Sequence, residues 1–192
     1  MLTSDRAASP LAQRLREGTV SLGEVFTFLS GLYFRGKLAY ATAFANPPDG
    51  APGVLIITPG GGLLEPQDRI DLSRLKTFAS VDVDEKNIAY RDPFENDARR
   101  IEGLSVGSEV VLLGSIATAK YIGVLSGVFG DRLRFPADFV GRGDMSRGGL
   151  LLRCVDSNSE LSYVEVSGAV RRGPRPPKLP KRRLIKAREP EQ

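Results

Sequence analysis

Glycines and cations gather in three loops of the chain, in a pattern typical of anion binding. The first loop, "TPGGGLL" over 58–64, carries Gly60, Gly61 and Gly62 directly after an apolar run. Because glycine has no side chain, such a loop can bring backbone N–H groups close to an anion. The loop fits neither a Walker motif nor a G-x-G-x-x-G fingerprint. A tight turn without a ligand is therefore the alternative interpretation.

The second loop, "GSIATAK" over 114–120, places two hydroxyls and an amine at the start of a predicted helix. We expect Ser115 to cap that helix and Thr118 to lie beside it. The unpaired amides and the dipole of a helix start both favour an anion. Lys120 lies about one turn into the helix, so its ammonium either reaches this end or points to solvent. A plain N-cap is the alternative.

The third loop, "GRGDMSRGG" over 141–149, holds four glycines and two arginines. Arg142 and Arg147 can form a fork-like clamp on a phosphate or carboxylate. In the alternative, Asp144 neutralises one arginine and the loop is an ordinary surface segment. The Arg-Gly-Asp triplet also resembles an adhesion signal. The single cysteine, Cys154, excludes an internal disulfide and favours a reducing compartment, which argues against adhesion.

The chain contains no histidine, so any acid–base chemistry falls to Asp, Glu, Lys or Tyr. Asp138 lies between apolar residues in "FPADFV", where burial could shift the pKa of its carboxyl. Asp138 and Asp144 are therefore the candidate general bases. The missing histidines exclude histidine-ligated zinc or iron, and one cysteine cannot form a four-thiolate site. We expect no metal and no cofactor.

The segment "LYFRGKLAY" over 32–40 mixes aromatic and basic side chains on a predicted helix. Tyr33, Lys37 and Tyr40 share one face of that helix, and Arg35 lies elsewhere. This face could form a stacking platform for a base beside a cation. Alternatively, the tyrosines pack against the rest of the protein while the cations extend to solvent.

Composition places the chain among ordinary globular proteins, with 41% apolar and 26% charged residues in 192. No apolar run approaches the roughly 20 residues that cross a bilayer, and the first residues lack the apolar core of a secretory signal. We expect a cytoplasmic protein that does not bind a membrane.

Strand-like and helix-like patterns alternate along the chain. The residues predict an α/β fold: a three-layer, Rossmann-like, mainly parallel sheet with a helical N-terminal segment and a C-terminal antiparallel strand pair. Ser21 with Glu24, Asp71, and Asp92 with Pro93 mark predicted helix starts. The expected helices are 5–17, 32–45, 72–80, 92–104 and 116–130, and the expected strands are 54–58, 109–115, 132–135, 149–155 and 161–166.

Positive charge is concentrated at the C-terminal end. Residues 169–192 carry nine Lys/Arg and two Asp/Glu, whereas the whole chain has a net charge of +4. We therefore predict one domain over 1–168 and a basic, proline-rich tail over 169–192. The stretch 171–188 could contact nucleic-acid phosphates or dock as a polyproline ligand. In the alternative, the tail wraps the domain or aids solubility.

The run "EVVLLGSIATAKYIGVL" over 109–125 resembles the strand-and-helix unit of the uracil-DNA glycosylase superfamily, in which an apolar strand ends in Gly-Ser before a helix. The resemblance implies that family's fold and a cleft for a base or a phosphate. The family's water-positioning Asp or Asn would fall in "TPGGG", which has neither, and its histidine motif has no counterpart. The resemblance therefore stops short of the family's reaction.

Ligands of open α/β sheets collect beyond the carboxyl ends of the strands, where all three loops are predicted to lie. The leading hypothesis is a domain that binds a nucleotide, nucleoside or other phosphorylated ligand, with hydrolysis or transfer at a glycosidic or phosphoryl centre if it is an enzyme. The rival hypothesis is a nucleic-acid-binding or adaptor protein that acts through its tail. The expected ligand-binding residues are Gly60, Gly61, Gly62, Ser115, Thr118, Lys120, Arg142, Arg147, Tyr33 and Lys37.

Overall fold

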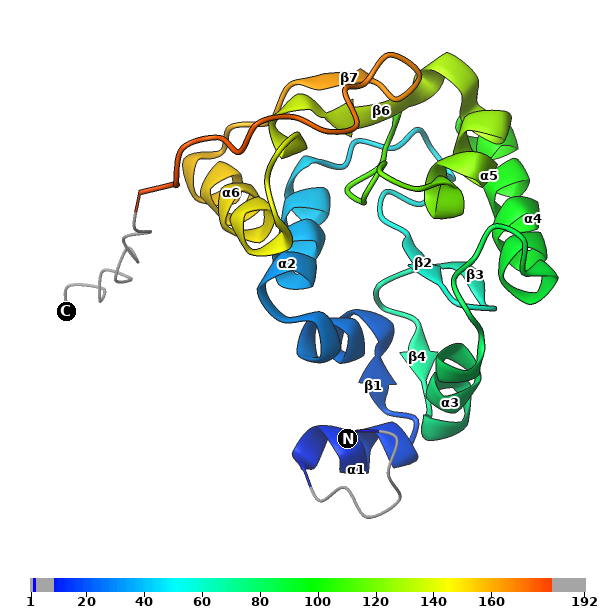
Figure 1. Cartoon of the computed structure of the whole chain (residues 1–192). Helices are drawn as coiled ribbons and strands as arrows, with labels where there is room; N and C mark the ends of the chain where they lie inside the picture. Colours follow the sequence, from blue (N-terminus) through cyan, green and yellow to red (C-terminus); the bar gives the residue numbers. More distant parts are fainter. Residues whose placement is uncertain (1, 3–8, 181–192) are drawn as a thin grey trace.

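Helices dominate the structure, a computed structural model that describes Leu2 and residues 9–180 (Figure 1). The α-helices are α1 Pro10–Arg16, α2 Leu22–Phe44, α3 Leu72–Ser80, α4 Ile88–Leu104, α5 Ala119–Phe129 and α6 Asp144–Ser157. The strands are β1 Val20–Ser21, β2 Ile56–Thr58, β3 Gly62–Leu64, β4 Arg69–Ile70, β5 Val110–Val111, β6 Leu133–Pro136 and β7 Tyr163–Glu165. Two short 3-10 turns, Gly130–Arg132 and Ala137–Phe139, flank β6.

The predicted three-layer, mainly parallel sheet is wrong. The strands form an antiparallel β1–β4 pair, an antiparallel β2–β3 hairpin and a three-stranded sheet in the order β5-β6-β7. Within the described residues, β5 and β6 are the one parallel pair. The run 54–58 does not continue into a crossover helix, because Gly60 and Gly62 adopt φ values of 73° and 69° and turn the chain straight back.

One strand of the predicted C-terminal antiparallel pair, 149–155, is also wrong. Residues 149–155 lie inside α6, which begins within the segment predicted as the third loop. The apolar run "GLLLRCV" is too short for periodicity to separate a strand from a buried helix. The other member is confirmed as β7, but it pairs antiparallel with β6, Phe135 lying opposite Val164.

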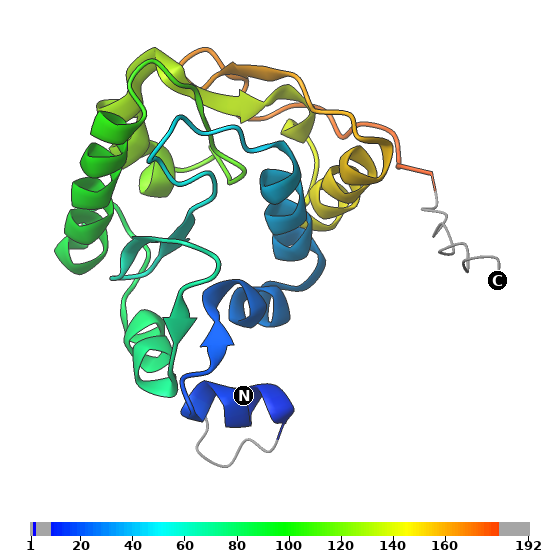
Figure 2. The same cartoon turned by 180° about the vertical axis from the view of Figure 1, so that it is seen from behind.

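Helices α2 and α6 lie side by side, as the two opposite views show (Figures 1 and 2). Two glycines meet where they cross. A Cβ atom built on Gly36 would lie 2.7 Å from the Gly148 carbonyl oxygen, and one built on Gly148 would lie 2.8 Å from the Leu32 carbonyl oxygen. The two backbones approach this closely only because neither position carries a side chain. Gly148, which lies in the loop predicted to bind an anion, serves helix packing.

Helix α2 joins two hydrophobic cores. It bends at Gly31, whose φ of 60° and ψ of −137° are not helical. Before the bend, α2 contributes Val25 to a core built with α1, β1, β4 and α3. After the bend, it contributes Tyr40 to the larger core, which α4, α5, β6 and α6 complete. The two halves of α2 therefore hold both ends of the molecule together.

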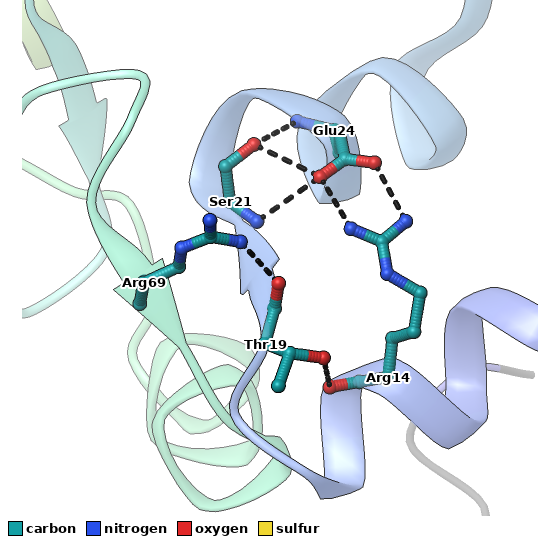
Figure 3. Close-up of polar contacts among 5 residues, drawn as sticks. All are labelled: Arg14, Thr19, Ser21, Glu24 and Arg69. Atoms are coloured by element: carbon teal, nitrogen blue, oxygen red, sulfur yellow. Dashed lines mark hydrogen bonds and ion pairs between the residues drawn. The ribbon is translucent and has the colours of Figure 1, made fainter.

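A predicted capping box at the start of α2 is confirmed. Ser21 Oγ accepts a hydrogen bond from the Glu24 amide, and the Glu24 carboxylate accepts one from the Ser21 amide (Figure 3). Arg14 of α1 donates two hydrogen bonds to the same carboxylate, at 2.9 and 3.0 Å. Arg69 of β4 donates to the Thr19 carbonyl. Glu24 therefore joins α1 to the start of α2.

Glu24 makes the stability of this region depend on pH. The hydrogen bonds from Arg14 lower the pKa of Glu24 from 4.5 to about 2. Because the folded-state pKa is depressed, its contribution is full above pH 4.5 and is lost as the pH falls to about 2. We expect Glu24→Gln to lower the free energy of unfolding by about 0.5 kcal/mol at pH 7, because glutamine keeps the capping hydrogen bond but loses the charge that pairs with the half-exposed Arg14. In urea unfolding, the free energies of unfolding of the wild type and the variant should converge as the pH falls to 2. A difference that stays the same at every pH would contradict this.

The other two predicted helix starts have opposite outcomes. Asp71 caps α3 as predicted, accepting from the Arg74 amide at 2.7 Å. The start at Asp92 is wrong, because α4 begins after Asn87, which accepts from the Ala89 amide. Pro93 therefore lies in the second turn of α4, where it has no N–H to donate to the helix.

Candidate functional site at the starts of α5 and α6

The parallel strands β5 and β6 end at the same edge of their sheet. The chain runs from β5 through residues 112–118 into α5, and from β6 through residues 137–143 into α6. Two of the three predicted loops therefore reach this edge. Ligands of parallel strands collect at such an edge, where helices begin.

Neither helix start is capped by a side chain. Thr118 is the N-cap of α5 and Gly143 is the N-cap of α6, and neither makes a side-chain capping hydrogen bond. The prediction that Ser115 caps α5 is wrong, because its hydroxyl accepts from the Ala117 amide within the loop, at 3.3 Å. The first amides of both helices thus have no capping side chain to accept their hydrogen bonds.

Lys120 and Arg147 lie in the first turns of α5 and α6, which begin at this edge, and Lys37 of α2 is a third cation nearby. Burial lowers the pKa of Lys37, and the charges of Arg147 and Lys120 lower it further, whereas Asp144 raises it. Lys37 therefore lies within the electrostatic influence of Asp144, Arg147 and Lys120, and we call these four groups the cationic cluster. Within the described part of the chain, none of its three cations forms an ion pair.

Arg147 is held by the chain that leaves β6. Its Nε and Nη2 atoms donate to the Phe139 carbonyl oxygen at 3.2 and 3.1 Å. Its guanidinium carbon lies 5.2 Å from the centroid of the Phe139 ring. Phe139 is fully buried, so its ring is a fixed support. Phe139 is a positioning residue that the sequence did not single out.

Tyr33 and Lys37 complete the contact with α2. The Tyr33 hydroxyl donates to the Leu113 carbonyl oxygen, just after β5, at 3.3 Å. Burial raises the pKa of Tyr33, while Arg147 opposes that change. The Lys37 ammonium lies 4.5 Å from the centroid of the Tyr33 ring, which also meets the Phe139 ring edge-on. The Tyr33 ring thus packs inside the protein and carries a cation on its face.

Lys120 is the third cation of the cluster. Its ammonium lies 4.9 Å from the centroid of the Tyr121 ring. Its carbonyl oxygen accepts a hydrogen bond from the buried Tyr90 of α4, at 2.9 Å. The first turn of α5 is therefore fixed to α4, while the Lys120 side chain has no hydrogen-bond partner among the described residues.

The glycine loop at 58–64 does not join the cluster. Cβ atoms built on Gly60 and Gly61 would meet Val81 and Phe78, and one built on Gly62 would meet Asp97. The Asp97 carboxylate also accepts from the Leu63 amide at 2.9 Å. The loop is therefore packed against α3 and α4, and its glycines serve a tight turn.

Arg142 and Asp138 also lie apart from the cluster. Arg142 donates to the Asp138 carbonyl oxygen and the Ser146 hydroxyl, and it lines a groove on the other side of α6 with Arg153. The Asp138 side chain is exposed, not buried as expected. After burial itself, the Asp138 charge is the second cause that raises the pKa of the Cys154 thiol.

Comparison with protein-family models, curated proteins and solved structures finds no match. The likeness of 109–125 to uracil-DNA glycosylases therefore stays a prediction, carried by the β5–α5 unit. Within the described residues, no helix combines the length and the apolar character needed to cross a bilayer. In the same residues, no three acidic or thiol side chains gather as metal ligands would.

Proposed function

We propose that the protein binds a small phosphorylated ligand, such as a nucleotide or a sugar phosphate, at the cationic cluster. One observation carries this proposal. Lys120 and Arg147 lie in the first turns of two helices that have no capping side chain among the described residues, and Lys37 lies within reach of both charges; none of the three forms an ion pair in the described chain. Amides at helix starts and cationic side chains are the groups that bind phosphate in proteins.

The charges of the cluster favour a dianion. Asp144 supplies one negative charge against the three positive charges of Lys37, Lys120 and Arg147. A phosphate would offset the remainder, and Ser115 and Thr118 could donate from the loop before α5. If the ligand reacts at a glycosidic or phosphoryl centre, Asp144 is the carboxylate within the cluster and the better candidate base. Asp138 is exposed and is not among the charges that act on Lys37.

Lys37→Met tests the proposal, because methionine keeps the length of the side chain without its charge. We expect the variant to be at least as stable as the wild type without ligand, because burial disfavours the lysine charge. Its affinity for ribose 5-phosphate or ATP should fall by about 10- to 100-fold, as expected for the loss of one charge-assisted hydrogen bond. Isothermal titration calorimetry and thermal shift would measure both.

Lys86→Met is the matched control, because Lys86 is an exposed lysine outside the cluster. A ligand at 100 times its Kd should stabilise the wild type and the control by about 2.7 kcal/mol. Equal stabilisation of the Lys37→Met variant would reject the cluster as the site. No stabilisation by inorganic phosphate, nucleotides or sugar phosphates would reject the function.

A further inference from the structure

A second group of cations lies on the other side of α6. Residues of α2, of α6 with the loop before it, and of the segment 175–179 enclose a groove of about 530 Å³. None of the described residues that line it is acidic. Its cations define what we call the basic groove: Arg35, Arg142, Arg153, Arg175 and Lys178.

Close backbone contacts hold the segment 173–180 in place as one wall of the basic groove. Gly141 has a φ of 74°, and a Cβ atom built there would collide with the Pro174 carbonyl group. A Cβ atom on Gly173 would lie 2.7 Å from a methyl carbon of Val140. Arg153 of α6 donates to the Pro180 carbonyl oxygen. Both views show this part of the chain running past α6 (Figures 1 and 2).

The charges of the basic groove are not neutralised within the described chain. Arg142 and Arg153 donate only to carbonyl and hydroxyl oxygens. The side chains of Arg35, Arg175 and Lys178 form no hydrogen bond and no ion pair with any described residue. The sequence "KRRLIKAR" over 181–188 then adds five more cations, and no Asp or Glu occurs from 174 to 188.

We propose that the basic groove binds the phosphate backbone of double-stranded nucleic acid. A run of cations without counter-charges fits a polyanion that carries many regularly spaced phosphates, and arginine is suited to phosphate geometry. None of the described lining residues is aromatic, so they offer no surface on which unpaired bases would stack. Binding through the backbone is therefore independent of sequence. Lys37 and Arg147 do not line the groove, so this proposal stands apart from the phosphorylated ligand.

The test is the salt dependence of binding to a labelled duplex of arbitrary sequence, measured by fluorescence anisotropy with the full chain. The variant Arg35→Gln/Arg175→Gln/Lys178→Gln removes the three cations that have no partner in the described chain. If each contacts one phosphate, the slope of log K against log salt should fall by roughly 2.7. Affinity at low salt should fall roughly tenfold or more.

The control Arg74→Gln/Lys76→Gln/Lys86→Gln makes the same change of charge on α3 and the loop after it. It should keep the wild-type slope. If the groove variant fails to fold, Arg35→Glu is used in its place, because Arg35 is exposed on α2. The groove variant leaves Lys37, Lys120 and Arg147 intact, so a failure of this proposal is distinct from a failure of the first.

Removal of residues 181–192 separates the basic groove from the cations that follow it. We expect the shortened chain to bind the duplex more weakly but to retain a slope that the groove variant reduces further. A groove variant that behaves like the control would overturn the proposal, as would complete loss of binding on removal of 181–192. Binding of polyglutamate but not of the duplex would also overturn it, in favour of an acidic protein partner.

Discussion

Gly148→Ala is expected to lower the free energy of unfolding by about 2–3 kcal/mol, the cost of overpacking a tight contact. The new Cβ atom would lie 2.8 Å from both the Leu32 carbonyl oxygen and the Tyr33 Cα atom. Both neighbours are backbone atoms of α2, so no side-chain rotation can relieve the clash. Gly36→Ala on the facing helix should act in the same direction, because its Cβ would lie 2.7 Å from the Gly148 carbonyl oxygen.

Two other helical glycines supply the control. Gly103 of α4 and Gly127 of α5 have nothing within 4 Å of a built Cβ atom. Alanine at either position should raise stability by about 0.5–1 kcal/mol, since alanine favours the helix over glycine. Chemical denaturation measures whether each variant raises or lowers the free energy of unfolding. An unchanged or raised stability of Gly148→Ala would show that the two helices do not cross this closely.

The helix crossing also sets the geometry of the cationic cluster. Gly36 precedes Lys37 on α2, and Gly148 follows Arg147 on α6. The two glycines that bring the backbones together are therefore sequence neighbours of two cluster cations. A variant that separates the helices should weaken the proposed phosphate binding as well as the fold.

Helix starts could be predicted from sequence where the signal is a side chain that bonds a nearby amide. Ser21 with Glu24 and Asp71 bond amides three residues away, so their caps follow from local spacing alone. The strand–helix–strand order over 109–135 is likewise observed, with β5 and β6 parallel. Asp92 and Pro93 gave a wrong helix start because an equally good N-cap, Asn87, lies about one turn earlier.

Sheet and site geometry depend on contacts between distant residues, which the local pattern does not specify. The run 149–155 becomes helical because Gly148 allows α6 to approach α2, a contact across more than 100 residues. The three loops were expected at one sheet edge. The loop 58–64 packs on α3 and α4 instead, because β2 turns back into β3. The same helix crossing brings Lys37 of α2 close to Arg147 of α6.

Phe139→Ala should strongly lower the free energy of unfolding. The Phe139 ring is fully buried and meets the Phe135 ring edge-on, with centroids 5.7 Å apart. Removing such a ring leaves a cavity that typically costs about 3–5 kcal/mol. Urea unfolding would measure this loss, and Phe139→Leu, which fills most of the space, should cost less than about 1.5 kcal/mol.

The leucine variant also separates the two ways in which Phe139 holds Arg147. It removes the ring beneath the guanidinium but keeps the backbone carbonyl that accepts two of its hydrogen bonds. A cation–π contact contributes about 0.5–2 kcal/mol, so phosphate affinity should fall by roughly 2- to 30-fold while the fold survives. Unchanged affinity in a stable Phe139→Leu variant would mean that the carbonyl alone positions Arg147. The ring would then serve the core and not the cluster.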